Sequence, residues 1–116
     1  MFSFSKSLIA ASSKPLILGI LKEGTSYGYA IIQRVKEISG DRLAWSDGML
    51  YPVLHRLEKE GLIESKWMQS EEGRHRKYYA ITALGNESLL QEKANWSSMN
   101  EVMEALWAIN PSTAKQ

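Results

Sequence analysis

Hydrophobic residues recur every three or four positions near the start of the chain, and this spacing predicts a helix within the stretch PLILGILKEG. The residues that carry the pattern are Leu16, Ile17, Ile20 and Leu21. Gly24 follows them as a C-terminal stop signal. Pro15 leaves two interpretations of the start. Either the helix begins at about Ser13, with the proline in its first turn, or it begins near Lys6 and kinks at the proline.

A second helix is predicted within TSYGYAIIQRVKEISG. Its shared apolar face comprises Tyr27, Ile31, Val35 and Ile38. Thr25 or Ser26 can cap the start through a side-chain oxygen, and Gly40 ends the helix. The short apolar piece RLAW, residues 42–45, is expected to form a brief strand.

The stretch SDGMLYPVLHRLEKEGLI predicts a third helix, although it contains a glycine and a proline, the two residues least favourable to helices. Ser46 or Asp47 can cap this helix, and Gly61 can end it. The apolar positions fall on one face, which comprises Leu50, Val53, Leu54 and Leu57. The opposite face carries Gly48, Pro52, His55 and Lys59, with Arg56 beside them. Neither helix-weakening residue therefore belongs to the core, and we expect the missing Cβ at position 48 to make room for the proline ring.

After Leu62 the hydrophobic period changes from that of a helix to that of a strand. Two strand-like runs, LIESKWMQ and RHRKYYAIT, flank the turn-forming segment SEEG and predict a β-hairpin. Tyr78 and Tyr79 alternate across the second strand, so one is buried and the other exposed, and the sequence does not say which. A basic cluster lies at the tip and the start of the second strand: Arg74, His75, Arg76 and Lys77.

A last, long helix is predicted from Thr82, which caps it, to about Ile109, with Pro111 ending it. Its apolar residues repeat at spacings typical of a coiled-coil seam. The residues of this seam, the candidate dimer interface, are Trp96, Met99, Val102, Met103, Leu106 and Trp107. The fold class is therefore mainly α with a small β-hairpin. We expect residues 1–82 to form a winged helix-turn-helix whose N-terminal helix joins the dimer contact, residues 83–110 to form the dimerisation helix, and residues 111–116 to form a flexible tail.

Composition limits the functions open to this chain. With 116 residues it is long enough for one domain, it has no cysteine, and no apolar run reaches membrane-spanning length, so we expect a cytoplasmic protein. The net charge is only +1, but residues 1–82 carry 12 Lys and Arg against 9 Asp and Glu, which mildly favours an anionic partner. No catalytic constellation, metal-ligand cluster or cofactor motif is present at useful spacing, so neither an enzyme nor a cofactor is expected.

Several motifs are similar to those of the PadR-type family of bacterial transcriptional regulators. MLYPVLHRLEKEGLI and EEGRHRKYYAITALG resemble the recognition helix and the wing of that family, and YGYAIIQRV resembles its second helix. The single C-terminal helix resembles the short subfamily, which includes regulators of multidrug pumps. The resemblance implies a homodimeric winged-helix repressor that binds a near-palindromic operator in double-stranded DNA and is released by a small planar aromatic effector. Met49 and His75 depart from the family pattern, which leaves the operator sequence open.

The helix-turn-helix and the hairpin together predict a DNA interface, in which the third helix reads bases and the wing holds phosphates. Ser26 and Tyr27 lie where the start of the second helix can reach a phosphate. The other candidate residues are Gly48, Tyr51, Pro52, His55, Arg56, Lys59, Arg74, His75, Arg76 and Lys77. The alternative is a winged-helix module that dimerises and binds protein instead of DNA.

Trp96 has two interpretations, because an aromatic residue in a helical seam is commonly part of a dimer core. The second interpretation is an effector site, in which two symmetry-related indoles sandwich a flat aromatic molecule. Polar neighbours on the same helix would form its rim, and the first helix would form a wall. The residues of this candidate site are Trp96, Glu92, Ser88, Asn95, Asn100, Leu8, Ala11 and Ser12.

Overall fold

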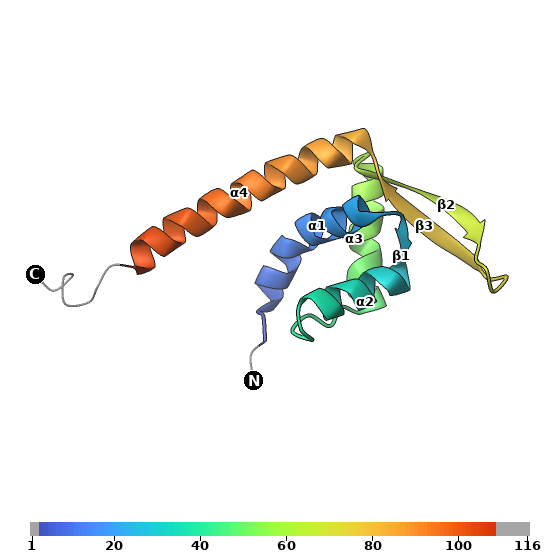
Figure 1. The fold of residues 1–116 in the computed structure, drawn as a ribbon, viewed down its shortest axis with the longest axis horizontal. Helices are drawn as coiled ribbons and strands as arrows, with labels where there is room; N and C mark the ends of the chain where they lie inside the picture. Colours follow the sequence, from blue (N-terminus) through green and yellow to red (C-terminus); the bar gives the residue numbers. More distant parts are fainter. Residues whose placement is uncertain (1–2, 109–116) are drawn as a thin grey trace, which may run out of the picture.

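The computed structural model describes residues 3–108 as four helices and a small sheet (Figure 1). The elements in chain order are α1 Lys6–Glu23, β1 Ser26–Tyr27, α2 Gly28–Ile38, α3 Asp47–Lys59, β2 Ile63–Gln69, β3 His75–Ile81 and α4 Ala83–Trp107. Helices α1, α2 and α3 pack together, the β2–β3 hairpin extends from one side, and α4 projects from the other (Figure 1). The fold class predicted from the sequence is thus confirmed.

The first helix is long, and Pro15 lies inside it. Ser5 caps the start by accepting a hydrogen bond from the Leu8 backbone N–H at 3.2 Å. A start at Ser13 is therefore wrong. The Ser13 side chain is buried and donates to the carbonyl of Ala10 at 2.8 Å, which satisfies its hydroxyl inside the helix.

The sheet has three strands and not two, in the order β1–β3–β2. Ser26 pairs with Tyr79 and Tyr27 with Tyr78, so these two residues form a strand along the outer edge of β3. The prediction that Thr25 or Ser26 caps α2 is wrong, because the backbone there is engaged in the sheet. Tyr27 occupies the capping position without a side-chain hydrogen bond.

The segment RLAW does not form a strand. Leu43 and Trp45 are buried in the connection between α2 and α3, and Trp45 belongs to the same apolar core as Leu50 and Leu54 of α3. The apolar character of this segment therefore reflects core packing of a loop and not a strand pattern. Ile38 also departs from its prediction, since 58% of its surface is exposed at the end of α2.

Helix α3 begins and ends where the sequence predicts. The Ser46 Oγ accepts from the Met49 backbone N–H at 3.2 Å. At the other end Gly61 adopts a positive φ of 79°, and the Leu62 N–H donates back to the carbonyl of Leu57 at 3.0 Å. The predicted core face is confirmed, because Leu50, Val53, Leu54 and Leu57 are all buried.

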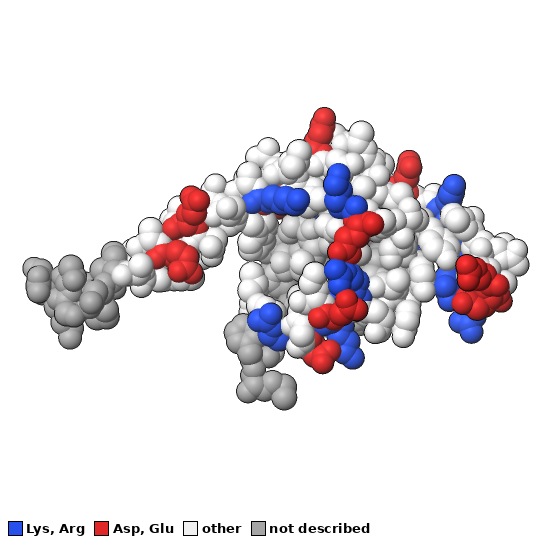
Figure 2. All heavy atoms as spheres, in the orientation of Figure 1, with Lys and Arg blue, Asp and Glu red and all other residues white. Residues whose placement is uncertain are grey.

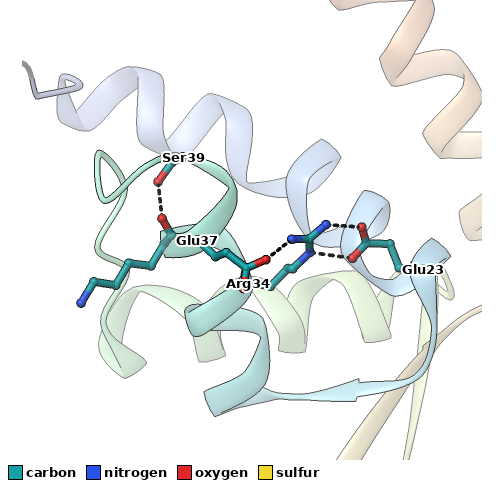
Figure 3. A network of polar contacts seen from close by, with 5 residues as sticks. Glu23, Arg34, Glu37 and Ser39 are labelled. Atoms are coloured by element: carbon teal, nitrogen blue, oxygen red, sulfur yellow. Dashed lines mark hydrogen bonds and ion pairs between the residues drawn. The ribbon is translucent and has the colours of Figure 1, made fainter.

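Arg34 of α2 joins two helices through its guanidinium group (Figure 3). Its Nε and Nη2 donate to the two carboxylate oxygens of Glu23 at the end of α1, at 2.9 and 2.7 Å. Its Nη1 donates to Glu37 at 2.6 Å. The hydrogen bonds from Arg34 hold the pKa of Glu23 below its ordinary value. This bidentate contact fixes α2 against α1 near the start of the helix-turn-helix.

Helix α4 is capped by Thr82, whose Oγ1 accepts from the Gly85 N–H at 3.0 Å, as predicted. Its first half packs on α1 through the buried Leu89, and its outer half extends away from the rest of the molecule (Figure 1). Ile109, Pro111 and the tail predicted for residues 111–116 lie outside the described residues. No helix within residues 3–108 combines the length and the apolar character needed to cross a membrane.

Candidate nucleic-acid interface

The outward face of α3 is exposed along its whole length. Its members are Gly48, Pro52, His55, Arg56 and Lys59. The core face behind it is fully packed, so the exposed side chains stand on a rigid helix. A rigid helix with a polar outer face and a slim first turn is suited to a DNA major groove.

The absent side chain of Gly48 does not make room for Pro52, and that expectation was wrong. A Cβ at position 48 would have only the Ser46 Oγ within 4 Å, at 3.9 Å. The proline ring crowds the backbone carbonyl four residues earlier, whereas a Cβ at that earlier residue points outward and back toward the N-terminus of the helix. The two groups therefore point in different directions. Gly48 therefore leaves open space on the exposed surface of α3.

Gly28 has a role that the sequence pattern did not reveal. A Cβ at this position would lie 2.8 Å from the Cζ of Tyr51 and even closer to its phenol oxygen. The first residue of α2 and the Tyr51 ring of α3 thus approach so closely that a Cβ at position 28 would require the ring to move. The only sign of this contact in the sequence is a glycine between two tyrosines at the start of a helix. That pattern does not identify Tyr51 as the partner.

The β2–β3 hairpin confirms the predicted wing. The strands pair from Ile63 opposite Ile81 to Gln69 opposite His75. In the turn the Ser70 N–H donates to the carbonyl of Arg74 at 2.7 Å, and Gly73 adopts a positive φ of 82°. The turn therefore has a fixed shape that holds the first basic residue of the cluster at the tip.

The four basic residues of the wing are not equivalent. Arg74 and His75 are exposed at the tip. The guanidinium of Arg76 lies 4.3 Å from the centre of the Tyr27 ring, a cation–π contact that ties the wing to β1. The Lys77 Nζ lies 3.8 Å from the Glu58 carboxylate of α3. Arg76 and Lys77 therefore help to hold the wing in place, and Arg74 and His75 are the pair presented outward.

The structure decides between the two tyrosines of β3. Tyr79 is 1% exposed, and its hydroxyl has no hydrogen-bond partner among the described residues. Burial raises the pKa of Tyr79, and the nearby Glu58 carboxylate and Tyr51 raise it further. Tyr78 instead meets the Tyr27 ring edge-on, with the ring centres 5.4 Å apart. Tyr79 is thus a core residue beneath the wing.

A groove of about 730 Å³ lies between the start of α2, the helix α3 and the wing. It brings together most of the predicted DNA-binding residues and adds four others. The lining residues are Tyr27, Gly28, Tyr29, Tyr51, His55, Trp67, Arg74, His75, Arg76, Lys77 and Tyr79. All of the ionisable side chains among them except the tyrosines are basic. A concave surface of this composition suits a polyanion such as a nucleic-acid backbone.

The remaining candidates lie outside this groove. Arg56 lines a second hollow, of about 390 Å³, between α1 and the start of α3. Ser26 is half-buried and lies near Glu23 and Arg34. Gly48, Pro52 and Lys59 stay on the exposed surface of α3, as described above. The predicted interface is therefore one groove with an adjoining helix face.

The model of the PadR-like family of transcriptional regulators matches residues 17–91, which span α1 to the first third of α4. The chain belongs to this family. It is a transcriptional regulator and not an enzyme, and PadR-like regulators bind DNA. The match to the family covers the winged part of the chain and extends into α4.

Solved structures agree with the family assignment. A transcriptional regulator from Clostridium thermocellum, Cth-833, superposes with a TM-score of 0.80 at 30% identity, over 88% of this chain and 96% of that chain. A PadR family transcription regulator from Clostridium difficile R20291 superposes with a TM-score of 0.74 at 33% identity, over 83% and 98%. In sequence, the chain is 38% identical to transcriptional regulator Rv3488 of Mycobacterium tuberculosis over 58 residues, which are 50% of this chain and 53% of that protein.

In this PadR-like regulator the effector candidates lie on α1 and α4. The Trp96 indole N–H donates to Glu92 at 3.2 Å, and Glu92 lies 3.7 Å from the Lys14 Nζ of α1. Trp96 is 36% exposed, so its side chain is partly accessible to solvent. Ser12 and Ser88 are half-buried, and Leu8, Ala11, Asn95 and Asn100 are exposed. Trp96 is thus oriented through α1 but is not enclosed within a single chain.

The outer half of α4 presents the predicted seam to solvent. Met99, Val102, Leu106 and Trp107 are each more than half exposed, and Met103 is half-buried. Figure 2 shows acidic side chains among uncharged surface on this part of α4, whereas charges of both signs are interspersed over the wing and α2. A projecting helix with so much exposed apolar surface is typical of an element that packs against another chain.

Proposed function

We propose that this PadR-like regulator is a homodimeric repressor in the cytoplasm, which binds a near-palindromic operator in double-stranded DNA. The observation that carries the proposal is the groove between α3 and the wing, whose formally charged lining is entirely basic. In the proposed complex α3 enters the major groove, and the wing lies along the sugar–phosphate backbone. Residues 1–82 act as the DNA-reading unit.

The proposed roles follow from where each side chain lies. His55 and Arg56 are exposed on α3 and contact base edges, while the slim surface of Gly48 and Pro52 lets the helix approach closely. Lys59, Arg74 and His75 contact phosphates. Tyr27, Tyr51, Arg76 and Lys77 line the groove, and Ser26 lies outside it on β1. Arg76 and Lys77 contribute positive charge while holding the wing.

Dimerisation through residues 83–110 follows from the exposed seam of α4. Burying this seam against a second copy would remove a large apolar surface from water, which is favourable at about 25 cal/mol per Å². A two-fold axis relates the two α3 helices, and an operator that matches them must then be nearly palindromic.

A small planar aromatic effector is proposed to bind beside Trp96. The partial exposure of Trp96 and the hydrogen bond from its indole to Glu92 support this site. A symmetry-related indole across the dimer axis would complete a sandwich, with polar groups from α4 at the rim and α1 as the wall. The competing interpretation, in which Trp96 only fills the dimer core, predicts no response to such molecules.

The second candidate function is a winged-helix module that dimerises and binds protein. The exposed Trp67 and Met68 on the wing favour it, because aromatic and methionine side chains are enriched in protein interfaces. The basic lining of the groove argues for DNA, since an interface core for protein is depleted of charge.

The experiment that separates the two functions is a gel-shift titration with the DNA upstream of the gene for this chain, at low salt. A retarded complex that dissociates on addition of planar aromatic compounds supports the repressor. Absence of any complex at low salt would contradict it. Fluorescence of the wild type and of Trp96→Ala on adding the same compounds shows whether Trp96 lines the effector site, because the variant must lose the response.

A further inference from the structure

Trp67 is the most exposed large hydrophobic residue of the wing, with 67% of its surface accessible. It lies in the middle of β2, opposite Lys77 of β3, and its side chain lines the groove that faces α3. Because the indole is largely exposed, it contributes little to the core. The indole is therefore accessible to a molecule that enters the groove.

A second aromatic side chain stands on the other wall of the same groove. Tyr29, near the start of α2, is 66% exposed and lines the groove together with Trp67. The charged side chains between these walls are basic, with His55 on α3 and Arg74 and His75 on the wing. The groove therefore combines exposed aromatic surface with positive charge, which suits an occupant that offers both apolar surface and negative charge.

The backbone of a DNA strand has this alternating character, because each phosphate is followed by a deoxyribose whose C–H groups are apolar. With α3 in the major groove, the strand that borders that groove passes between α3 and the wing. Bases of an intact duplex stay stacked on the far side of the backbone, so the sugar is the surface that a side chain on this wall meets first. Sugar and phosphate contacts make up a large share of protein–DNA interfaces.

We propose that Trp67 binds DNA by packing its indole against a deoxyribose of the strand held in this groove, as the non-ionic part of a backbone cradle. The assignment rests on the proposed function, and it adds a residue and a type of contact that the basic motif of the wing does not include. Arg74 and His75 hold the flanking phosphates. Trp67 supplies apolar contact and fixes how deeply the backbone sits.

Salt dependence distinguishes this contact from the ionic ones. A phosphate contact releases counterions, so removing it reduces the magnitude of the negative slope of log K against log salt by about one. An indole packed on a sugar releases none. Trp67→Ala should therefore weaken DNA binding roughly tenfold at every salt concentration and leave the slope unchanged, whereas Arg74→Gln should make the slope shallower.

Met68 is the matched control because it is the next residue of β2, is also exposed, and points to the opposite face of the sheet. Met68→Ala should bind DNA like the wild type. Trp67→Phe should recover part of the loss, because it retains an apolar ring. Thermal melts followed by circular dichroism establish that each variant is folded.

The experiment is a fluorescence-anisotropy titration of a labelled duplex from the upstream region with the wild type and these variants, at four salt concentrations. Parallel salt plots, with Trp67→Ala displaced to weaker binding and Met68→Ala coincident with the wild type, support the assignment. The assignment of Trp67 is overturned if folded Trp67→Ala binds DNA with wild-type affinity, if Met68→Ala loses as much affinity as Trp67→Ala, or if the salt slope of Trp67→Ala changes. Each of these outcomes leaves the proposed function intact. If the wild type binds no duplex, the proposed function fails and the assignment fails with it.

Discussion

The Tyr51 ring of α3 packs directly on Gly28, the first residue of α2, so closely that a Cβ at position 28 would lie 2.8 Å from the Tyr51 Cζ. This contact joins the two helices that form the helix-turn-helix. Tyr51 also lines the groove, so the contact links the core of the motif to the surface proposed to bind DNA.

Gly28→Ala should lower the free energy of unfolding by about 1–3 kcal/mol, because the added methyl group overpacks the contact and forces the Tyr51 ring to move. Urea unfolding measures this loss. DNA affinity should fall as well, since the displaced ring lies in the groove. The matched control is Gly19→Ala in α1, where a Cβ would meet nothing within 4 Å, and which should be neutral or stabilising. Equal destabilisation by both substitutions would refute the proposed role of the contact.

Gly48→Ala should separate folding from DNA binding. A Cβ at this position has open space around it, and alanine favours helix formation over glycine by up to about 1 kcal/mol, so the melting temperature should rise or stay unchanged. DNA affinity should fall, because the methyl group stands on the surface that approaches the DNA. A stable variant with undiminished affinity would show that no close approach occurs at Gly48.

Arg74→Gln and Lys77→Gln should differ in their effects on DNA binding. Arg74 is exposed at the wing tip, whereas the Lys77 ammonium lies 3.8 Å from the Glu58 carboxylate. We therefore expect the Arg74 variant to reduce the magnitude of the salt slope of binding by about one, and the Lys77 variant to reduce it by less. Binding isotherms at several salt concentrations test this order, and a larger slope change for Lys77→Gln would reverse the assignment.

The seam of α4 accounts for most of the exposed apolar surface of that helix. Met99→Glu combined with Leu106→Glu should give monomers in sedimentation-velocity experiments, because charges cannot be buried between two helices without large cost. Leu90→Glu is the control, since Leu90 is also exposed on α4 but lies on a different face of the helix. A dimer that persists in the double variant would place the interface elsewhere.

The features that the sequence predicts well are those with a repeated pattern or a local hydrogen bond. The buried face of α3, the caps at Ser46 and Thr82, and the turn at Gly61 belong to this group. Each depends on residues within a few positions of one another, so short-range spacing is sufficient to identify it.

The features that the sequence did not predict depend on distant contacts. The strand β1 forms because it pairs with the edge of β3. It has only two residues, which is too short a run to show the alternating pattern of a strand. The segment RLAW appeared strand-like because Leu43 and Trp45 are apolar, yet they are apolar to fill the core from a loop. The partner of Gly28 and the position of Trp67 in the groove likewise required the folded chain.

The central claim is that DNA occupies the groove between α3 and the wing, and site-specific photocrosslinking tests it most directly. A photoreactive phenylalanine analogue would replace His55 on α3, His75 on the wing, or Leu90 on α4, each in the otherwise unchanged chain. With duplex DNA from the upstream region, positions 55 and 75 should both crosslink to DNA and position 90 should not. Absence of DNA adducts at 55 and 75, or adducts only to protein at these positions, would contradict the account.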